Sequence, residues 1–279
     1  LTREDLSNYE VIERTPLKTD FNGKTIITNP IPSPGGTLIA FVLKIMSQKF
    51  PGKKIDNRLL TLGMRLAQIA YSEVISSKNR SSSLVKILSP RYLNRYINFF
   101  DSEISIGLSK EKPGSGSTTH LSIIDSKGNA TSVTTTNGEG CGYIIPGTGI
   151  MMNNMLGEDD LNPDGFHNWE TTKRMSTMMS PTIVIGDSGP ELVLGSGGSN
   201  RIRSAIKQVI LNKFTNNMNL EEAIKAPRIH LEENIIHCEP GINTDKLNFP
   251  WSTIHRWHEK NLFFGGVNAV TPTNAVGDP

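Results

Sequence analysis

The chain has 279 residues, of which 36% are hydrophobic, and its 29 basic and 27 acidic side chains leave a formal net charge of +2. This near-balance argues against a nucleic-acid or membrane partner, and no apolar run approaches the roughly 18 residues that a membrane helix requires. Two cysteines, Cys141 and Cys238, cannot build a disulfide framework and favour a reducing compartment such as the cytoplasm. Because the first residue is Leu1 and not Met, we expect a piece of a longer polypeptide.

The first hundred residues combine short strands with longer helices. Residues 2–10 begin as a capped helical turn, and residues 24–28 form a strand that ends in a stretch rich in proline and glycine. Apolar residues three and four positions apart indicate helices further on. The predicted helices cover residues 37–50, 57–77 and 92–100. The polar segment 78–90 is expected to be exposed.

The second half of the chain is richer in strands. Strand pairs are predicted over 121–154, and a further pair joins 181–185 to 191–194. The later predicted elements are an amphipathic helix over 201–214, a short helix over 221–226, a surface helix over 251–261 and a strand over 264–270. An antiparallel sheet with helices on its faces, α+β in class, accommodates this order.

The junction between the halves carries the most specific chemical signal. A Gly/Ser-rich stretch ends at Ser117, and Thr118 then opens a strand pair. A threonine hydroxyl is a weak nucleophile unless a base lies beside it, and a free α-amine with a pKa of about 8 is such a base. Thr118 has no α-amine until the chain breaks before it. We therefore predict self-cleavage, in which the Thr118 hydroxyl attacks the Ser117 carbonyl and water cleaves the resulting ester.

Two other segments could bind charge. The glycine-rich turn 195–199 is either an ordinary strand-to-helix turn or a set of backbone donors for an oxyanion or a carboxylate. The acidic segment 153–160 is either a solvated loop or a counter-charge for a substrate ammonium group, supplied by Glu158 or Asp159.

The remaining polar residues do not indicate a metal or a cofactor. His258 and Glu259 resemble half of a zinc motif, but Leu262 occupies the position of its second histidine. His120 is expected to point to the strand face opposite Thr118, and so not to serve as its base. Cys141 is expected to be a small buried residue within a strand.

Several segments, taken in order, resemble the γ-glutamyltranspeptidase family. The matching segments are 6–9, 14–17, 29–36, 118–130, 147–155, 179–184, 195–201, 226–230 and 277–279. The resemblance implies an N-terminal-nucleophile hydrolase with an αββα sandwich. Residues 1–117 would be the end of its large subunit and 118–279 its small catalytic subunit, joined as a heterodimer after self-cleavage.

The resemblance also implies the reaction and its residues. A γ-glutamyl group would pass from a glutathione-like donor to water, an amino acid or a peptide, without a cofactor or metal. Thr118 matches the nucleophile, Thr136 the threonine that supports it, and Gly198 and Ser199 the residues whose N–H groups stabilise the oxyanion. The substrate-binding positions are Asn154, Glu158, Asp159 and Thr177.

Some positions depart from the family pattern. Ser199 stands where a second glycine is usual, Gly138 and Met155 replace polar residues, and Thr177 with Met178 replaces a pair of serines. The segment 159–180 is shorter than the usual lid-bearing loop, and the arginine that binds the substrate carboxylate belongs to a segment upstream of this sequence. Two alternatives therefore stay open: a cephalosporin-type acylase with a glutaryl substrate, and an unprocessed, non-catalytic homologue.

Overall fold

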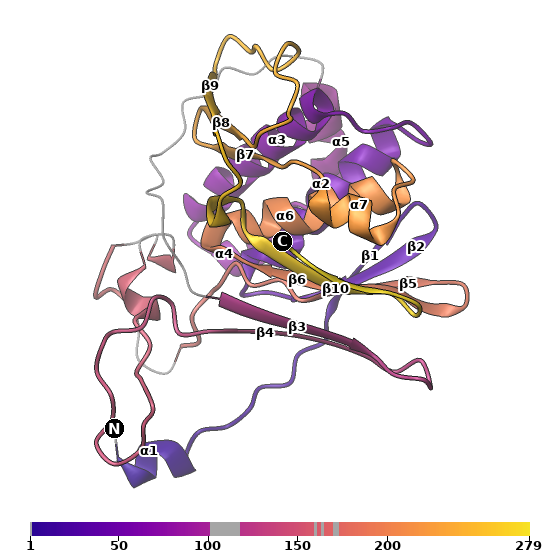
Figure 1. Ribbon diagram of the computed structural model, residues 1–279. Helices are drawn as coiled ribbons and strands as arrows, with labels where there is room; N and C mark the ends of the chain where they lie inside the picture. The colour runs from indigo at the N-terminus through magenta and orange to yellow at the C-terminus, as the bar shows by residue number, and fades with distance from the viewer. Residues whose placement is uncertain (1, 101–117, 159–160, 163–164, 170–172) are drawn as a thin grey trace.

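The computed structural model describes residues 2–100, 118–158, 161–162, 165–169 and 173–279 (Figure 1). The residues outside this described part include Leu1, Ser117 and Asp159, on which sequence-based predictions rest. Among the described residues, no helix combines the length and the apolar character needed to cross a membrane.

A six-stranded antiparallel sheet joins the two halves of the chain. Its strands, in spatial order, are β1 (Leu17–Phe21), β2 (Lys24–Thr28), β5 (Thr182–Gly186), β6 (Gly189–Gly197), β10 (Gly266–Val270) and β11 (Ala275–Gly277). Where the two halves of the chain meet in this sheet, Thr28 of β2 lies opposite Thr182 of β5. Strands from both sides of the Ser117–Thr118 junction therefore share one backbone hydrogen-bond network.

A two-stranded hairpin lies on one face of this sheet (Figure 1). It consists of β3 (Thr118–Ile124) and β4 (Ala130–Thr136). The Asp125 carboxylate closes its turn by accepting the backbone N–H groups of Lys127 and Asn129, both at 2.8 Å. The Ser132 hydroxyl donates to the Leu194 carbonyl of β6 at 3.2 Å, which ties the hairpin to the larger sheet.

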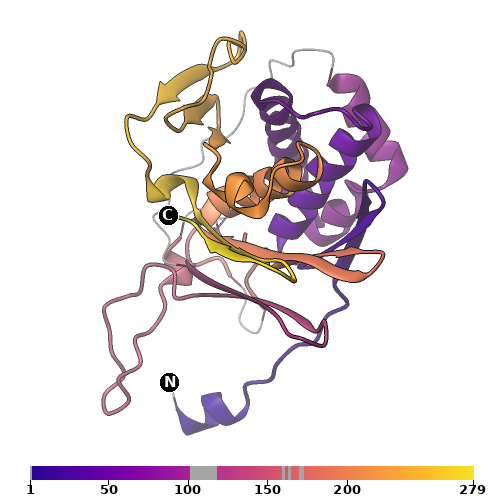
Figure 2. The same cartoon turned by 45° about the vertical axis from the view of Figure 1, so that its right-hand side comes forward.

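Helices cover the opposite face of the six-stranded sheet (Figures 1 and 2). They are α2 (Pro34–Lys49), α3 (Asn57–Ile75), α4 (Arg80–Lys86), α5 (Pro90–Phe99), α6 (Ile202–Phe214) and α7 (Leu220–Lys225). α2 packs against β1, α3, α5 and α6, so that Leu38, Ile39 and Phe41 are each at most 1% exposed. These layers confirm the α+β prediction and the helices predicted in the first half.

The chain begins with α1 (Arg3–Ser7), which has no buried residue. Thr2 and Asp5 form a capping box there, as the sequence pattern predicts. Short 3-10 turns in the described part of the chain include η1 (Met155–Gly157), η3 (Ser199–Arg201) and η4 (Leu262–Phe264).

The predicted surface helix over 251–261 is wrong. Strand β9 (Thr253–Arg256) occupies this segment and runs parallel to β8 (Ile235–Cys238), which pairs with β7 (Ile229–Glu232). A β-branched residue such as Ile254 has restricted side-chain freedom in a helix, and here it packs against the core.

Two further expectations need correction. The segment 78–90 is not simply exposed, because α4 and the turn after it bury Leu84 and Ile87 to 3% and 1% exposure. No strand forms over 149–152, where a single isolated bridge pairs Met151 with Ile144. Five glycines with positive φ interrupt regular structure in this region: Gly138, Gly140, Gly142, Gly147 and Gly149. Cys141 is consequently exposed rather than buried.

Candidate active site

Thr118 and Thr136 lie directly opposite each other at the open end of the hairpin. The Thr118 hydroxyl donates to Thr136 Oγ1 at 3.2 Å, and the backbone N–H of Gly138 donates to the same oxygen at 2.9 Å. Thr136 is therefore held from the backbone side while it fixes the direction of the Thr118 hydroxyl.

Glycines in β6 allow the hairpin to approach the sheet. A Cβ atom at Gly197 would lie 2.5 Å from the Thr118 carbonyl oxygen, and one at Gly195 would overlap the His120 ring. A real Cβ atom does not approach other heavy atoms so closely, so only glycine at 195 and 197 permits this distance between the hairpin and β6. This close packing places Thr118 against Gly197 at the end of β6, next to Gly198.

Gly198 and Ser199 form a turn at the start of η3. Their φ angles are +114° and +49°, both in the left-handed region, and the turn is closed by the Arg201 N–H bonding the Gly198 carbonyl at 2.9 Å. Successive backbone N–H groups in such a turn form a concavity that suits an anion. Because the donor is the backbone, serine in place of the second glycine leaves it intact.

Five of the predicted site residues line one small cavity of about 20 Å³. They are Thr118, Thr136, Glu158, Thr177 and Ser199, and Met155 and Met178 also line it. This volume accommodates about one water molecule and is far below the roughly 300 Å³ at which ligand pockets begin. A substrate acyl group therefore requires side chains to move, and methionine is the residue type that repacks most easily.

Asn154 supports this cavity from outside. Its side-chain oxygen accepts the backbone N–H groups of Glu139 and Gly140 at 2.7 and 3.1 Å, which holds the turn after β4 against the segment leading to Glu158. Asn154 is not among the residues that line the cavity. In this structure the Asn154 side chain therefore positions the backbone at Glu139 and Gly140.

The glycine at position 138 follows from the same packing. Gly138 has a φ of +64°, and a Cβ atom there would lie 2.5 Å from Glu158 Oε1 and would also overlap the Asn154 side chain. A larger residue at 138 is therefore incompatible with this placement of Glu158. The departure from the family pattern at 138 has a local structural reason.

The prediction that His120 points to the strand face opposite Thr118 is wrong. Residues two apart in a strand share a face, and His120 points to the six-stranded sheet on the same side as Thr118. Its two ring nitrogens contact the hydroxyls of Thr134 and Ser122, each at 2.8 Å. Burial lowers the pKa of His120 to about 4, so the ring is neutral at pH 7 and fully engaged by its neighbours.

A larger pocket of about 570 Å³ lies on the other side of Thr118 and Gly198. Its polar wall contains a pair that sequence reasoning missed: Arg228 and Asp278, joined at 2.5 Å, with the arginine side chain only 5% exposed. Glu239 completes the cluster by accepting the Arg228 backbone N–H at 2.7 Å, and burial raises the pKa of this carboxyl. Residues 226–230 and 277–279 were singled out only as family-like segments; the structure brings them together.

Among the described residues, no three histidine, cysteine or acidic side chains are arranged to hold a metal ion. Asp159, which was predicted to bind the substrate, lies outside the described part of the chain.

The sequence of this chain is similar to one family model and to several known proteins. The family model described as Gamma-glutamyltranspeptidase matches residues 1–276. The glutathione hydrolase proenzyme of Escherichia coli is 30% identical over 88% of this chain and 47% of its own length. A Pseudomonas acylase proenzyme is 27% identical over 97% of this chain and 50% of its own.

A solved structure extends this likeness to the fold. The cephalosporin acylase from Bacillus halodurans has a TM-score of 0.73 at 21% identity, over 100% of this chain and 54% of the acylase. Its topology matches the mixed α+β arrangement described above. The chain spans about half the length of the curated relatives that it matches.

Proposed function

Because this chain belongs to the gamma-glutamyltranspeptidase family, we propose that the protein is an acyltransferase that cleaves itself before Thr118. It then moves a γ-glutamyl group from a glutathione-like donor to water, an amino acid or a peptide. The observation that carries the proposal is the 3.2 Å hydrogen bond between the Thr118 and Thr136 hydroxyls, beside a cavity that contains Glu158.

In the self-cleavage step, Thr118 Oγ1 attacks the carbonyl carbon of Ser117. The peptide C–N bond breaks, and the Ser117 acyl group is transferred to the hydroxyl oxygen while the Thr118 nitrogen becomes a free amine. Water then hydrolyses the ester, which restores the Thr118 hydroxyl and leaves a carboxylate on Ser117. The products are the chains ending at 117 and beginning at 118.

In the transfer step, the new α-amine accepts the proton of the Thr118 hydroxyl as its oxygen attacks the γ-carbonyl of the donor. The backbone N–H groups of Gly198 and Ser199 stabilise the resulting oxyanion. The leaving amine takes the proton, and a threonyl ester of the γ-glutamyl group remains. Water or the amine of an acceptor then attacks this ester and regenerates Thr118.

Substrate charge supports roles for Glu158 and Thr177. Among the described residues that line the small cavity, Glu158 is acidic, and beside Thr177 it would hold the α-ammonium group of the donor. The sequence offers Asp159 as a second candidate for this contact. None of these lining residues is cationic. The α-carboxylate of the donor would therefore need a cation that is not among these lining residues.

The two chains would remain associated as a heterodimer of a 1–117-containing large subunit and a 118–279 small subunit. Pairing of β2 with β5 and packing of α2 against α6 support this, because both contacts cross the cleavage point.

Variants of Thr118 test the mechanism in the full-length protein. Thr118→Ala should abolish both chain cleavage and release of p-nitroaniline from a γ-glutamyl anilide, whereas Thr118→Ser should retain slower versions of both. A full-length protein that never cleaves and never turns over the anilide is the non-catalytic homologue. Cleavage or turnover by Thr118→Ala contradicts the proposed chemistry.

The second candidate function is a glutaryl acylase. The likeness to the Pseudomonas acylase and the altered residues Gly138, Met155 and Met178 favour it. A glutaryl group is a γ-glutamyl group without the α-ammonium, so the two anilides differ only in the charge that Glu158 would bind. If the protein is a γ-glutamyl enzyme, Glu158→Gln should lower kcat/KM for the γ-glutamyl anilide by about tenfold or more and leave glutaryl turnover unchanged. A wild-type preference for the glutaryl anilide selects the acylase.

A further inference from the structure

One lysine is buried in the helical layer without a polar partner. Lys207, in the second turn of α6, is only 2% exposed, whereas the other lysines of the described part are half-buried or exposed. Within that part of the chain, its side-chain nitrogen has no hydrogen bond and no ion pair. Lysine is almost never buried in this way unless it is paired, because an unpaired charge in the interior is costly.

Lys207 faces the junction of α3, α6 and β7. Residues three and four positions apart lie on one face of a helix, so Lys207 shares its face with Ser204 and Arg203. The Ser204 hydroxyl contacts His230 Nδ1 of β7 at 2.9 Å. The Arg203 guanidinium lies 5.9 Å from the centre of the Tyr71 ring of α3. The amine therefore lies among packed elements and beside a second basic group.

These surroundings favour an uncharged amine over an ammonium group. Burial, and to a smaller extent repulsion by the Arg203 guanidinium, lower the pKa of Lys207 from 10.5 to about 7. His230 adds no charge at neutral pH, because burial holds its pKa well below 6.5. About half of the Lys207 side chains are therefore uncharged at pH 7, and a desolvated, uncharged lysine amine is a nucleophile.

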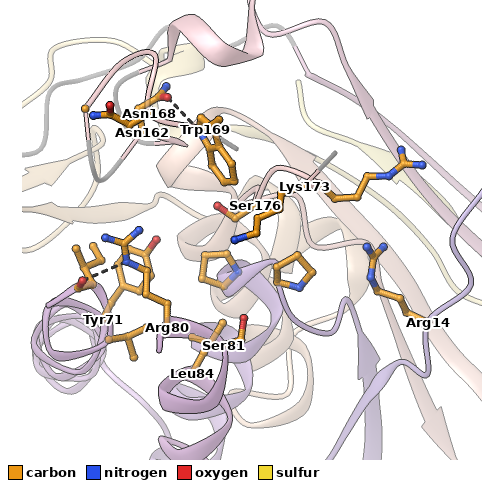
Figure 3. Close-up of a pocket in the computed structure, with 16 residues that line it drawn as sticks. Arg14, Tyr71, Arg80, Ser81, Leu84, Asn162, Asn168, Trp169, Lys173 and Ser176 are labelled. Atoms are coloured by element: carbon orange, nitrogen blue, oxygen red, sulfur yellow. Dashed lines mark hydrogen bonds between the residues drawn. The ribbon is translucent and has the colours of Figure 1, made fainter. Parts of the chain in front are cut away.

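Access limits the electrophile that this amine can meet. Tyr71 lines a pocket of about 500 Å³ beside α3 and α4 (Figure 3), and this pocket therefore comes within one side chain of Arg203. Lys207 is not among the described residues that line it. A reagent has to pass from such a pocket into the packed interior, so the electrophile has to be small and uncharged.

We propose that Lys207 is a modification site for carbon dioxide, which forms a carbamate on its Nζ atom. The amine lone pair attacks the carbon of CO₂, so that a C–N bond forms, one C=O π bond becomes a C–O⁻ group, and the amine loses a proton to water. The product carries one negative charge. The Arg203 guanidinium, which repels the ammonium form, attracts this carbamate. The modification does not depend on the proposed acyl transfer at Thr118.

Trapping of the carbamate in the full-length protein tests the proposal. The protein is equilibrated at pH 8 with ¹³C-labelled carbon dioxide, the carbamate is ethylated with a trialkyloxonium salt, and the digested peptides are mapped by mass spectrometry. The peptide that contains Lys207 should carry the labelled, ethylated carbamate. Chain-end α-amines also react with CO₂ and serve as the internal control. A Lys207 peptide without the label, in a sample whose chain ends are labelled, overturns the proposal.

Variants and pH separate Lys207 from the other amines. In ¹³C NMR spectra under the same gas, Lys207→Met should lose one carbamate resonance. Lys213→Met, which replaces a half-buried lysine of the same helix, should keep it. The uncharged fraction of an amine with a pKa of about 7 falls about tenfold from pH 8 to pH 6, so at constant dissolved CO₂ this resonance should fall at least as much. A full set of carbamate resonances in Lys207→Met contradicts the assignment.

Discussion

Gly138 and Glu158 lie so close together that a single methyl group between them cannot be accommodated. A Cβ atom at 138 would approach Glu158 Oε1 to 2.5 Å. Gly138→Ala should therefore displace Glu158 and raise KM for a γ-glutamyl anilide by about tenfold, with a loss of stability of about 1–3 kcal/mol.

A matched control separates this collision from backbone strain. Gly142 has a similar φ of +75°, but nothing lies within 4 Å of its Cβ position. Gly142→Ala should lower the free energy of unfolding comparably while leaving KM unchanged. Equal KM values for the two variants would show that the contact with Glu158 is unimportant.

Thr136 is expected to act through its hydroxyl oxygen. Thr136→Val keeps the shape of the side chain but removes the acceptor for the Thr118 hydroxyl. Self-cleavage and kcat should fall by about 10- to 100-fold, while Thr136→Ser should restore most of both. Cleavage time courses on denaturing gels and steady-state kinetics measure the two effects; a fully active valine variant contradicts this role.

Ser199 is expected to contribute its backbone and not its hydroxyl. Ser199→Ala and Ser199→Gly both keep the N–H group in the turn, so kcat/KM should stay within about threefold of wild type. A loss of more than tenfold in both variants would instead assign a role to the side chain.

The Asn162 side chain is expected to position Glu158 by binding the Glu158 backbone carbonyl. Its side-chain NH₂ donates to the carbonyls of Leu156 and Glu158 at 3.0 and 2.7 Å, while its oxygen accepts the Trp169 indole N–H. Asn162→Asp keeps this acceptor but loses both donors, so KM for the γ-glutamyl anilide should rise severalfold and kcat should change little. An unchanged KM would show that Glu158 is held by other contacts.

Stability should depend on pH through His120. Burial lowers its pKa from 6.5 to about 4 in the folded state, so the unfolded chain binds the additional proton between these values. The contribution of His120 to stability is therefore complete above pH 6.5 and decreases as the pH falls to about 4, by at most about 3 kcal/mol. Urea unfolding at pH 7.5 and pH 5 should show the decrease, and His120→Gln should reduce it. His237, whose pKa burial also lowers to about 4, and His230, whose pKa burial lowers well below its ordinary value, supply the remainder.

The sequence predicts those parts of the site that depend on local regularity. The turn at Ser126–Asn129 and the alternation on either side of it set the hairpin register, which brings Thr118 opposite Thr136. Glu158 and Thr177 lie in irregular segments, so their common cavity was expected only from the family resemblance.

Other features depend on tertiary packing that no local pattern encodes. Arg228 and Asp278 are fifty residues apart and meet only because β10 and β11 complete the sheet. The strand β9 was predicted as a helix because its partner β8 lies elsewhere in the sequence.

N-terminal sequencing of the smaller chain in purified, active full-length protein tests the central claim most directly. The proposal predicts two chains, with the smaller one beginning at Thr118-Thr119-His120. An active enzyme that remains a single polypeptide across Ser117 and Thr118 would contradict it.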